Sequence, residues 1–206
     1  MVYMPRSGEA TRQNILDTAQ GLILQHGFAG ASIERIINGA HITKGAFFHH
    51  FPNKAALAEA VIGRFIDIEA TMFTDICRRA ERLSDDPVQR VLNILELYAD
   101  ALDSHPEVVD GCLYASVALQ RGEFPDTVTE ITAKSIEQTT ALLRPYFEAA
   151  MTAASPKRDC NADALADMFV CVGEGAFILA GLKRDPSIPG QQFRALKSQW
   201  ELLLGR

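Results

Sequence analysis

Apolar residues recur at helical spacing along almost the entire chain. The first stripe consists of Ile15, Ala19, Leu22 and Ile23. These positions follow the i, i+4, i+7, i+8 pattern of a helix that buries one face. Alternation of apolar and polar residues, the pattern of a half-buried strand, is almost absent. The sequence therefore predicts an all-α protein.

Capping residues and helix breakers divide this pattern into about nine helices. Gly27 ends the first helix, and Ser32 is a suitable N-cap for a second helix of about two turns. Gly39 is expected to take the left-handed conformation that ends this second helix. Thr43 caps a third short helix, which Pro52 closes. The later helices are expected near 54–80, 88–103, 106–120, 125–151, 162–183 and 191–204.

The fourth helix is much longer than the three before it. Asn53 caps it, and its apolar stripe is expected to contain Leu57, Val61, Phe65, Ile68, Met72 and Ile76. At about 1.5 Å per residue such a helix spans roughly 40 Å, which is long enough to join two domains. We therefore expect one domain over residues 1–52 and another over residues 53–206.

Composition and charge restrict the class of protein. The 206 residues, 48% of them hydrophobic, suit one domain or two small ones with a sizeable core. The longest apolar stretch, residues 168–182, contains Glu174 and falls short of the roughly 18 uncharged residues that span a bilayer. The N-terminus lacks the apolar segment of an export signal. These features predict a cytoplasmic protein without membrane contact.

The net charge of −6 is unevenly distributed. Residues 1–54 carry five basic and three acidic side chains, a net charge of +2, so the remainder carries −8. This difference in sign indicates that the N-terminal part meets a polyanion. The second and third predicted helices, joined by a tight turn, also form a helix-turn-helix, whose second helix fits the major groove of DNA. That helix begins with small and polar residues, Thr43, Lys44, Gly45 and Ala46.

The residues in this region resemble the DNA-binding domain of TetR-family transcriptional regulators. The resemblance covers about residues 9–60 and includes Gly27-Phe28, Ala31-Ser32-Ile33 and the run from Ile42-Thr43-Lys44-Gly45-Ala46-Phe47 to Phe51-Pro52-Asn53-Lys54. It implies that Ser32 and Lys54 hold backbone phosphates, and that Thr43, Lys44, Ala46 and His49 lie at or near the groove. Phe48 stands where the family most often has Tyr, so its DNA contact would be van der Waals only.

The segment Cys171-Val-Gly173-Glu174-Gly175-Ala176-Phe177 resembles the penultimate helix of the same family. Together with the last helix it fits a two-helix-per-subunit dimer interface, which implies a homodimer on a palindromic operator. The expected interface residues are Gly173, Gly175, Phe177, Phe193, Leu196 and Trp200. The alternative is that these residues form an ordinary intramolecular core.

The family resemblance also implies a ligand cavity between the middle helices. The candidates are apolar or carry one polar group: Phe65, Met72, Tyr98, Tyr114, Met168 and Phe169, with Tyr146 as a further tyrosine. Each of them is also a plausible core residue. No cofactor is implied, and Glu174, within an apolar stretch, would be costly to bury without a partner.

The resulting hypothesis is a ligand-responsive, DNA-binding regulator, a repressor that a small-molecule inducer releases from its operator. We expect no enzyme, because common catalytic motifs are missing, and no metal site, because adjacent histidines on one helix point about 100° apart. The four cysteines are expected to be free thiols, with Cys171 in a core. Two alternatives remain: a helical interaction module that has lost DNA binding, and a redox sensor that uses Cys112, although Glu107 and Asp110 disfavour its thiolate.

Overall fold

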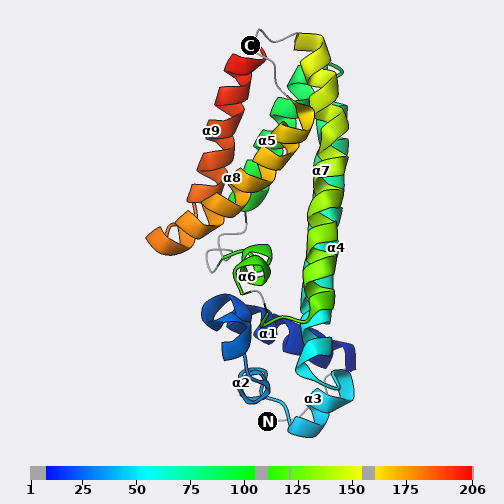
Figure 1. Ribbon diagram of the computed structural model, residues 1–206, viewed down its shortest axis with the longest axis vertical. Helices are drawn as coiled ribbons and strands as arrows, with labels where there is room; N and C mark the ends of the chain where they lie inside the picture. Colours follow the sequence, from blue (N-terminus) through cyan, green and yellow to red (C-terminus); the bar gives the residue numbers. More distant parts are fainter. Residues whose placement is uncertain (1–7, 105–110, 121, 155–160, 206) are drawn as a thin grey trace, which may run out of the picture. The chain divides into compact units, whose positions relative to one another are not determined.

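The computed structural model describes residues 8–104, 111–120, 122–154 and 161–205, and these residues form nine helices without a strand (Figure 1). This confirms the all-α prediction. The helices are α1 Gly8–Gly30, α2 Ile33–Gly39, α3 Lys44–His50, α4 Lys54–Leu83, α5 Pro87–Asp103, α6 Leu113–Leu119, α7 Asp126–Ala154, α8 Ala162–Lys183 and α9 Ile188–Leu203.

Packing divides the chain into two compact units. The N-terminal unit comprises Met1–Ile66 and Leu113–Thr132, and the C-terminal unit comprises Asp67–Cys112 and Ala133–Arg206. α4 and α7 each contribute to both units. The boundary expected after residue 52 marks the end of the helix-turn-helix segment and remains a prediction about the DNA-binding domain; the compact units follow different limits.

The three predicted caps of the N-terminal unit are present. The side-chain oxygens of Ser32, Thr43 and Asn53 accept hydrogen bonds from backbone N–H groups three residues further on, at 3.2, 3.1 and 2.8 Å. These bonds satisfy donors that the first turn of a helix leaves without partners. The two short helices and the start of α4 therefore begin where local sequence alone indicates.

The glycines of this unit act differently from the prediction. The left-handed residue after α2 is His41, with φ 53°, and Gly39 does not have a positive φ. Gly27 has φ 74° and ψ 168°, and it interrupts α1 instead of ending it, because a further turn continues to Gly30. Asn14 of α1 donates to the carbonyl oxygen of Ala40 at 2.7 Å, which fixes the end of α2 against α1.

Aromatic rings fill the core of the C-terminal unit. Tyr98 of α5 lies 5.1 Å from Phe169 of α8 and 4.6 Å from Phe193 of α9, measured between ring centroids. Phe73 of α4 stacks on Tyr98 at 5.0 Å. These four rings bring α4, α5, α8 and α9 together around one dense cluster, and edge-to-face pairs of this kind add to the stabilisation from burial.

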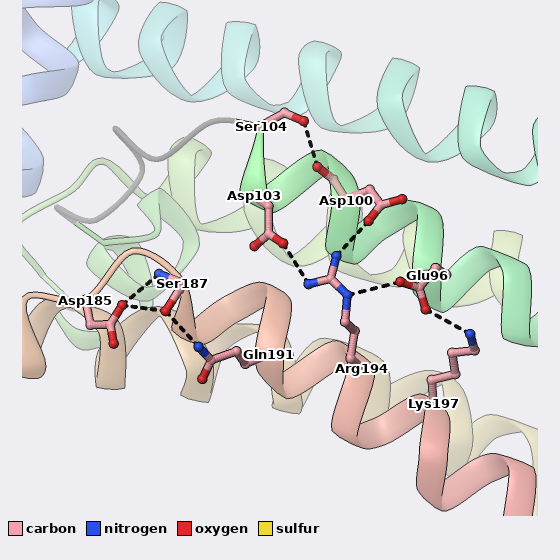
Figure 2. Close-up of polar contacts among 9 residues, drawn as sticks. All are labelled: Glu96, Asp100, Asp103, Ser104, Asp185, Ser187, Gln191, Arg194 and Lys197. Carbon is pink, nitrogen blue, oxygen red and sulfur yellow. Dashed lines mark hydrogen bonds and ion pairs between the residues drawn. The ribbon is translucent and has the colours of Figure 1, made fainter.

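Charged side chains join α9 to α5 on one side of this core (Figure 2). Arg194 donates to Glu96 at 3.0 Å, to Asp100 at 2.6 Å and to Asp103 at 2.7 Å. Lys197 donates to the second oxygen of Glu96 at 2.8 Å. The two cations lower the pKa of Glu96, with the Lys197 hydrogen bond as the larger cause. Three acids that would repel one another are thus held on one face of α5.

Two predicted details of the later helices were wrong. Ile68 is 58% exposed, because the buried face of α4 moves from Leu57 and Val61 in the N-terminal unit to Phe73 and Ile76 in the C-terminal unit. α9 begins at Ile188 rather than near 191 and includes Gly190 in its first turn.

A close approach explains the glycine in that turn. A Cβ on Gly190 would lie 2.1 Å from Asp103 Oδ1, so glycine permits α9 to approach α5 closely.

The predicted start of the sixth helix near Pro106 lies outside the described residues, and α6 of the structure begins at Leu113.

The break in α1 gives a prediction about stability. Gly27→Ala is expected to lower the free energy of unfolding by about 1–3 kcal/mol, because alanine is strained at this φ and ψ. Its Cβ would also lie 2.9 Å from Oε1 of Gln120. Urea denaturation measures the change.

The matched control is Gly21→Ala, also in α1, where a Cβ meets no heavy atom within 4 Å. This control should stabilise the protein by about 0.5–1 kcal/mol through helix propensity. Equal effects of the two substitutions would contradict the role assigned to Gly27.

Candidate functional site

α3 presents a small exposed face over a deeply buried ring. Phe47 is fully buried and packs against Phe51, with ring centroids 6.2 Å apart, and this contact fixes the rotation of α3 on the N-terminal unit. Exposed side chains then lie on the opposite side, at Thr43, Lys44, Phe48 and His49, whereas Ala46 is half-buried. The structure therefore brings together the residues that sequence assigned to the DNA groove.

Lys44 and Phe48 lie one turn apart on this face. The Lys44 ammonium is 6.0 Å from the centroid of the Phe48 ring, and Phe48 is 41% exposed. An exposed phenyl ring beside a cation can pack against the deoxyribose of the DNA backbone or the methyl group of a thymine, while the cation meets a phosphate. Ser32 is half-buried at the start of α2; its oxygen caps the helix, and that bond does not use the hydroxyl hydrogen.

Lys54 is directed into the N-terminal unit. Its ammonium donates to the carbonyl oxygen of Phe28 and, at 3.4 Å, to that of Ala29. It also lies 4.2 Å from the centroid of the Phe28 ring, and burial lowers the pKa of Lys54. In this arrangement Lys54 joins α4 to the break in α1. The phosphate contact expected for Lys54 would require these bonds to be broken.

The same break binds residues that follow α6. The backbone N–H of Phe28 donates to Oε1 of Gln120 at 2.7 Å, and the N–H of Ala29 donates to Glu123 at 3.3 Å. Phe28 and Phe124 stack with their centroids 4.3 Å apart. We call this set of contacts the α1 clamp. The clamp joins residues more than 90 positions apart, so helical periodicity does not indicate it, although a glycine break inside a helix leaves N–H groups that need acceptors.

The six ligand candidates do not form one site. Phe65 and Tyr114 pack edge to face in the N-terminal unit, with centroids 5.0 Å apart. Tyr98 and Phe169 belong to the aromatic core of the C-terminal unit, where Met72 is half-buried and Met168 is 40% exposed. The role of the six residues in ligand binding stays a prediction. Tyr98 and Phe169 pack tightly against each other, which makes these two rings part of the structural core.

Two acidic side chains meet inside the C-terminal unit beside a thiol. Burial, together with the nearby charge of Glu174, raises the pKa of Glu69 to about 7. Burial also raises the pKa of Glu174, which accepts a hydrogen bond from Sγ of Cys112 at 3.2 Å. Oε2 of Glu174 is buried without a hydrogen-bond partner. Glu174 could be recognised from the sequence as an acid that is costly to bury without a partner. Glu69 could not, since the two acids come together only when α4 and α8 pack against each other.

Several residues expected at a dimer interface are buried within the single chain. Phe193, Leu196 and Trp200 are 0%, 3% and 3% exposed, so they have no surface to offer a second copy in this conformation. A Cβ on Gly173 would lie 3.5 Å from Phe193, an ordinary van der Waals contact, so Gly173 faces α9 of the same chain. For these four residues the intramolecular core, the alternative left open by sequence, describes the structure. Phe177 is also buried, at 8%.

α8 nevertheless has a continuous exposed stripe of apolar and small residues, spaced by three or four. The α8 stripe consists of Ala164, Met168, Cys171, Gly175, Ile178 and Leu182. Ile178 is 47% exposed and Leu182 is 79% exposed. The expectation that Cys171 lies in a core was wrong, because the stripe and the core occupy opposite faces of α8.

α8 is also the one helix within the described ranges that is long and apolar enough to cross a membrane, and a third of its most apolar window is buried. Its inner face forms part of the protein core through Leu165, Phe169 and Ala176. A helix that packs into a core and exposes an apolar outer face is typical of an association surface on a protein.

Comparison with known proteins identifies the family. The family model described as "Bacterial regulatory proteins, tetR family" matches residues 15–61. The model described as "Tetracyclin repressor-like, C-terminal domain" matches residues 87–196, more than half of the chain. The chain belongs to the TetR family. It is therefore a helix-turn-helix transcriptional regulator, as the sequence predicted.

Relatives of this TetR-family regulator extend along most of its length. The HTH-type transcriptional repressor DhaR of Mycobacterium sp. (strain GP1) is 25% identical over 84% of both chains. The HTH-type transcriptional repressor NemR of Escherichia coli (strain K12) is 25% identical over 67% of both chains. A TetR-family regulator from Agrobacterium tumefaciens has the same fold, with a TM-score of 0.76 at 20% identity over 94% of this chain and 98% of that one.

The two lysines of the TetR-family site are predicted to differ in their effect on stability. Lys54→Met should lower the free energy of unfolding by about 1–2 kcal/mol, because the carbonyl oxygen of Phe28 loses its charged donor. Lys44→Met, at an exposed position on α3, should change it by less than about 0.5 kcal/mol. Chemical denaturation of both variants checks this, and a stable Lys54→Met protein would refute the inward role of Lys54.

The buried acid pair predicts an unusual pH dependence. Because the pKa of Glu69 rises from 4.5 to about 7, the folded protein keeps a proton that the unfolded chain releases between these values. The free energy of unfolding should therefore fall as pH rises through this window, by at most about 3 kcal/mol. Urea denaturation between pH 5 and 8 measures the slope.

Glu69→Gln should remove most of this slope and should be more stable than the natural chain at pH 8. The exposed Glu130→Gln on α7 is the matched control and should leave the slope unchanged. A natural protein whose stability rises between pH 5 and 7 would show that Glu69 is ionised in the fold.

Proposed function

We propose that this TetR-family regulator is a repressor that binds a palindromic operator as a homodimer in the cytoplasm and leaves it when a small molecule binds. The observation that carries the proposal is the exposed face of α3, where Thr43, Lys44, Phe48 and His49 stand over the buried Phe47. The relatives DhaR and NemR, both named as transcriptional repressors, support repression over activation.

On DNA, α3 would lie in the major groove with its first turn toward the bases. Thr43 and Lys44 then supply a hydroxyl and an ammonium near the phosphates, and the methyl group of Ala46 suits contact with thymine. His49 extends the polar face by one further turn. Phe48 can add only apolar contact, which makes Lys44 the principal cation on this face.

The α8 stripe and the outer face of α9 would form the dimer contact. The exposed face of α9 is uncharged and consists of Gln191, Gln192, Ala195, Ser198, Gln199 and Leu202. The charged residues Arg194 and Lys197 are directed to α5 instead. Two copies would thus bury mainly apolar and neutral surface, with the exposed Asp167 as a charged residue beside the α8 stripe, and small residues such as Gly175 allow the helices to approach closely. Twofold symmetry then makes a palindromic operator the natural target.

The α1 clamp offers a route from ligand binding to DNA binding. Gln120, Glu123 and Phe124 follow α6 directly, and they hold the part of α1 that Lys54 also contacts. A ligand that moves α6 would alter this clamp and so shift the position of the helix-turn-helix. Typical couplings of this kind amount to about 1–3 kcal/mol, which changes operator affinity roughly 5–150-fold.

The redox alternative has less support. Cys112 is buried and gives its hydrogen bond to the carboxylate of Glu174, and a neighbouring negative charge opposes formation of the reactive thiolate. The relatives are regulators, so catalysis has no support from them, and no group of three metal-ligating side chains occurs within the described residues.

Selection of bound fragments from random duplex DNA tests the proposed function. We expect a palindromic site that binds at least about 10³-fold tighter than scrambled DNA, with an affinity that falls steeply with salt. Lys44→Gln should weaken binding to all sequences and reduce the salt slope by roughly one ion. Failure of the folded protein to enrich any sequence would favour the interaction-module alternative.

Ile178→Glu tests the dimer in the same assay. A carboxylate in the centre of the α8 stripe should give a monomer in analytical ultracentrifugation and weaken binding of the palindrome. Ala153→Glu, at an exposed position on α7, is the matched control and should remain dimeric. A dimeric Ile178→Glu protein would show that another surface mediates association.

A further inference from the structure

A groove of about 430 Å³ lies on the C-terminal unit between the end of α4, the first turns of α5 and the second half of α7. This volume is within the usual range for small-molecule sites. The groove shares no residue with the aromatic core, with the buried acid pair or with the α8 stripe. It is a separate feature of the unit.

One wall of the groove is apolar and rigid. Pro87 begins α5, and Leu142 and Pro145 lie on α7. Pro145 has no N–H, so it cannot donate to the carbonyl oxygen of Ala141, which lines the groove one turn earlier. The small side chains of Ala141 and Ala149 are exposed and leave room for a ligand between the helices.

A fixed tyrosine lies at the second side of the groove. The hydroxyl of Tyr146 donates to Oε1 of Glu81 at 2.8 Å, which joins α7 to α4. Burial, together with this bond to Glu81, raises the pKa of Tyr146, so the phenol stays protonated and continues to donate. Glu81 is exposed and receives this hydrogen bond, which reduces the negative character of this side of the groove.

Arg90 supplies a positioned cation. Its Nε donates to the carbonyl oxygen of Ser84 at 2.7 Å, and Nη2 donates to Asp85 at 3.2 Å. Asp85 is fully exposed, so this ion pair is weak. Among the described residues Nη1 has no partner. A guanidinium fixed by a backbone carbonyl, with free donors beside an apolar wall, matches the carboxylate of an amphipathic molecule.

We propose that this groove is a binding site for small arylalkanoic acids, with the carboxylate on Arg90 and the aryl group between Pro87, Leu142 and Pro145. The carboxylate would take the Nη1 donors of Arg90, and it can displace the exposed Asp85 from Nη2. The site adds to the proposed function and does not depend on it, because occupancy is measured without DNA.

Isothermal titration of the full chain with 4-phenylbutyrate tests the site. We expect saturable binding of one molecule per chain, and at least roughly tenfold weaker binding of the neutral 4-phenylbutyramide. Arg90→Gln should weaken binding of the acid by at least about tenfold and leave binding of the amide unchanged. Arg79→Gln, an exposed arginine on α4 outside the groove, is the matched control.

A second variant fills the groove without touching the core. Ala149→Phe should abolish binding of both compounds, whereas Ala153→Phe, one turn further along the same helix and also exposed, should not. Thermal unfolding verifies that each variant is folded. The proposal is overturned if neither 4-phenylbutyrate nor 5-phenylpentanoate binds saturably, or if Arg90→Gln and Ala149→Phe both bind like the natural chain.

Discussion

The break in α1 at Gly27 is the constraint on which the N-terminal unit depends. Because the backbone leaves the helical conformation there, the N–H groups of Phe28 and Ala29 need acceptors from elsewhere, and the carbonyl of Phe28 accepts a charged donor besides the N–H of Ala31. Gln120, Glu123 and Lys54 supply them. One irregular turn therefore joins the helix-turn-helix, the start of α4 and the segment after α6. In the proposed function, this joint is the route by which a movement of α6 would reach the helix-turn-helix.

In the C-terminal unit the distribution of charge decides which surfaces are available. Arg194 and Lys197 form ion pairs with the acidic face of α5, and the aromatic cluster packs against the inner faces of α8 and α9. The exposed face of α9 is consequently uncharged, and that of α8 is apolar along its stripe, with the exposed Asp167 beside it. Such surface is costly to leave in water over a large area, and a second copy of the chain is an economical way to cover it. In the proposed dimer, the same two helices would serve the core of one chain with their inner faces and association with their outer faces.

The polar groups of the C-terminal unit fall into two environments with opposite chemistry. Glu69 and Glu174 are withdrawn from water beside each other, and this environment favours a bound proton. Arg90 lies at the edge of an apolar groove, and its Nη1 donors are directed to no other described residue. This environment favours a bound anion. Of the rings that sequence had suggested for a ligand, Tyr146 lines this groove. Tyr98 packs against Phe169 in the aromatic core, and Phe65 packs against Tyr114 in the N-terminal unit.

Features that depend on neighbouring residues were predictable from the sequence. The caps at Ser32, Thr43 and Asn53, the short α3 and the buried Phe47 follow from hydrogen bonds and spacing within about four residues. The family match and the exposed face of α3 were predictable for the same reason, since the motif is contiguous. The left-handed His41, the exposed Ile68 and the exposed Cys171 were not, because each depends on how helices rotate against their neighbours.

Local sequence thus determined where α2, α3 and α4 begin, which residues form the recognition helix and to which family the chain belongs. Tertiary structure alone decided that Lys54 turns inward, that Trp200 lies in the core and that Glu69 meets Glu174. The physical reason is the range of the interactions. A cap closes within one helical turn, whereas each of these three outcomes needs a partner from another helix, and periodicity does not indicate which helix that will be.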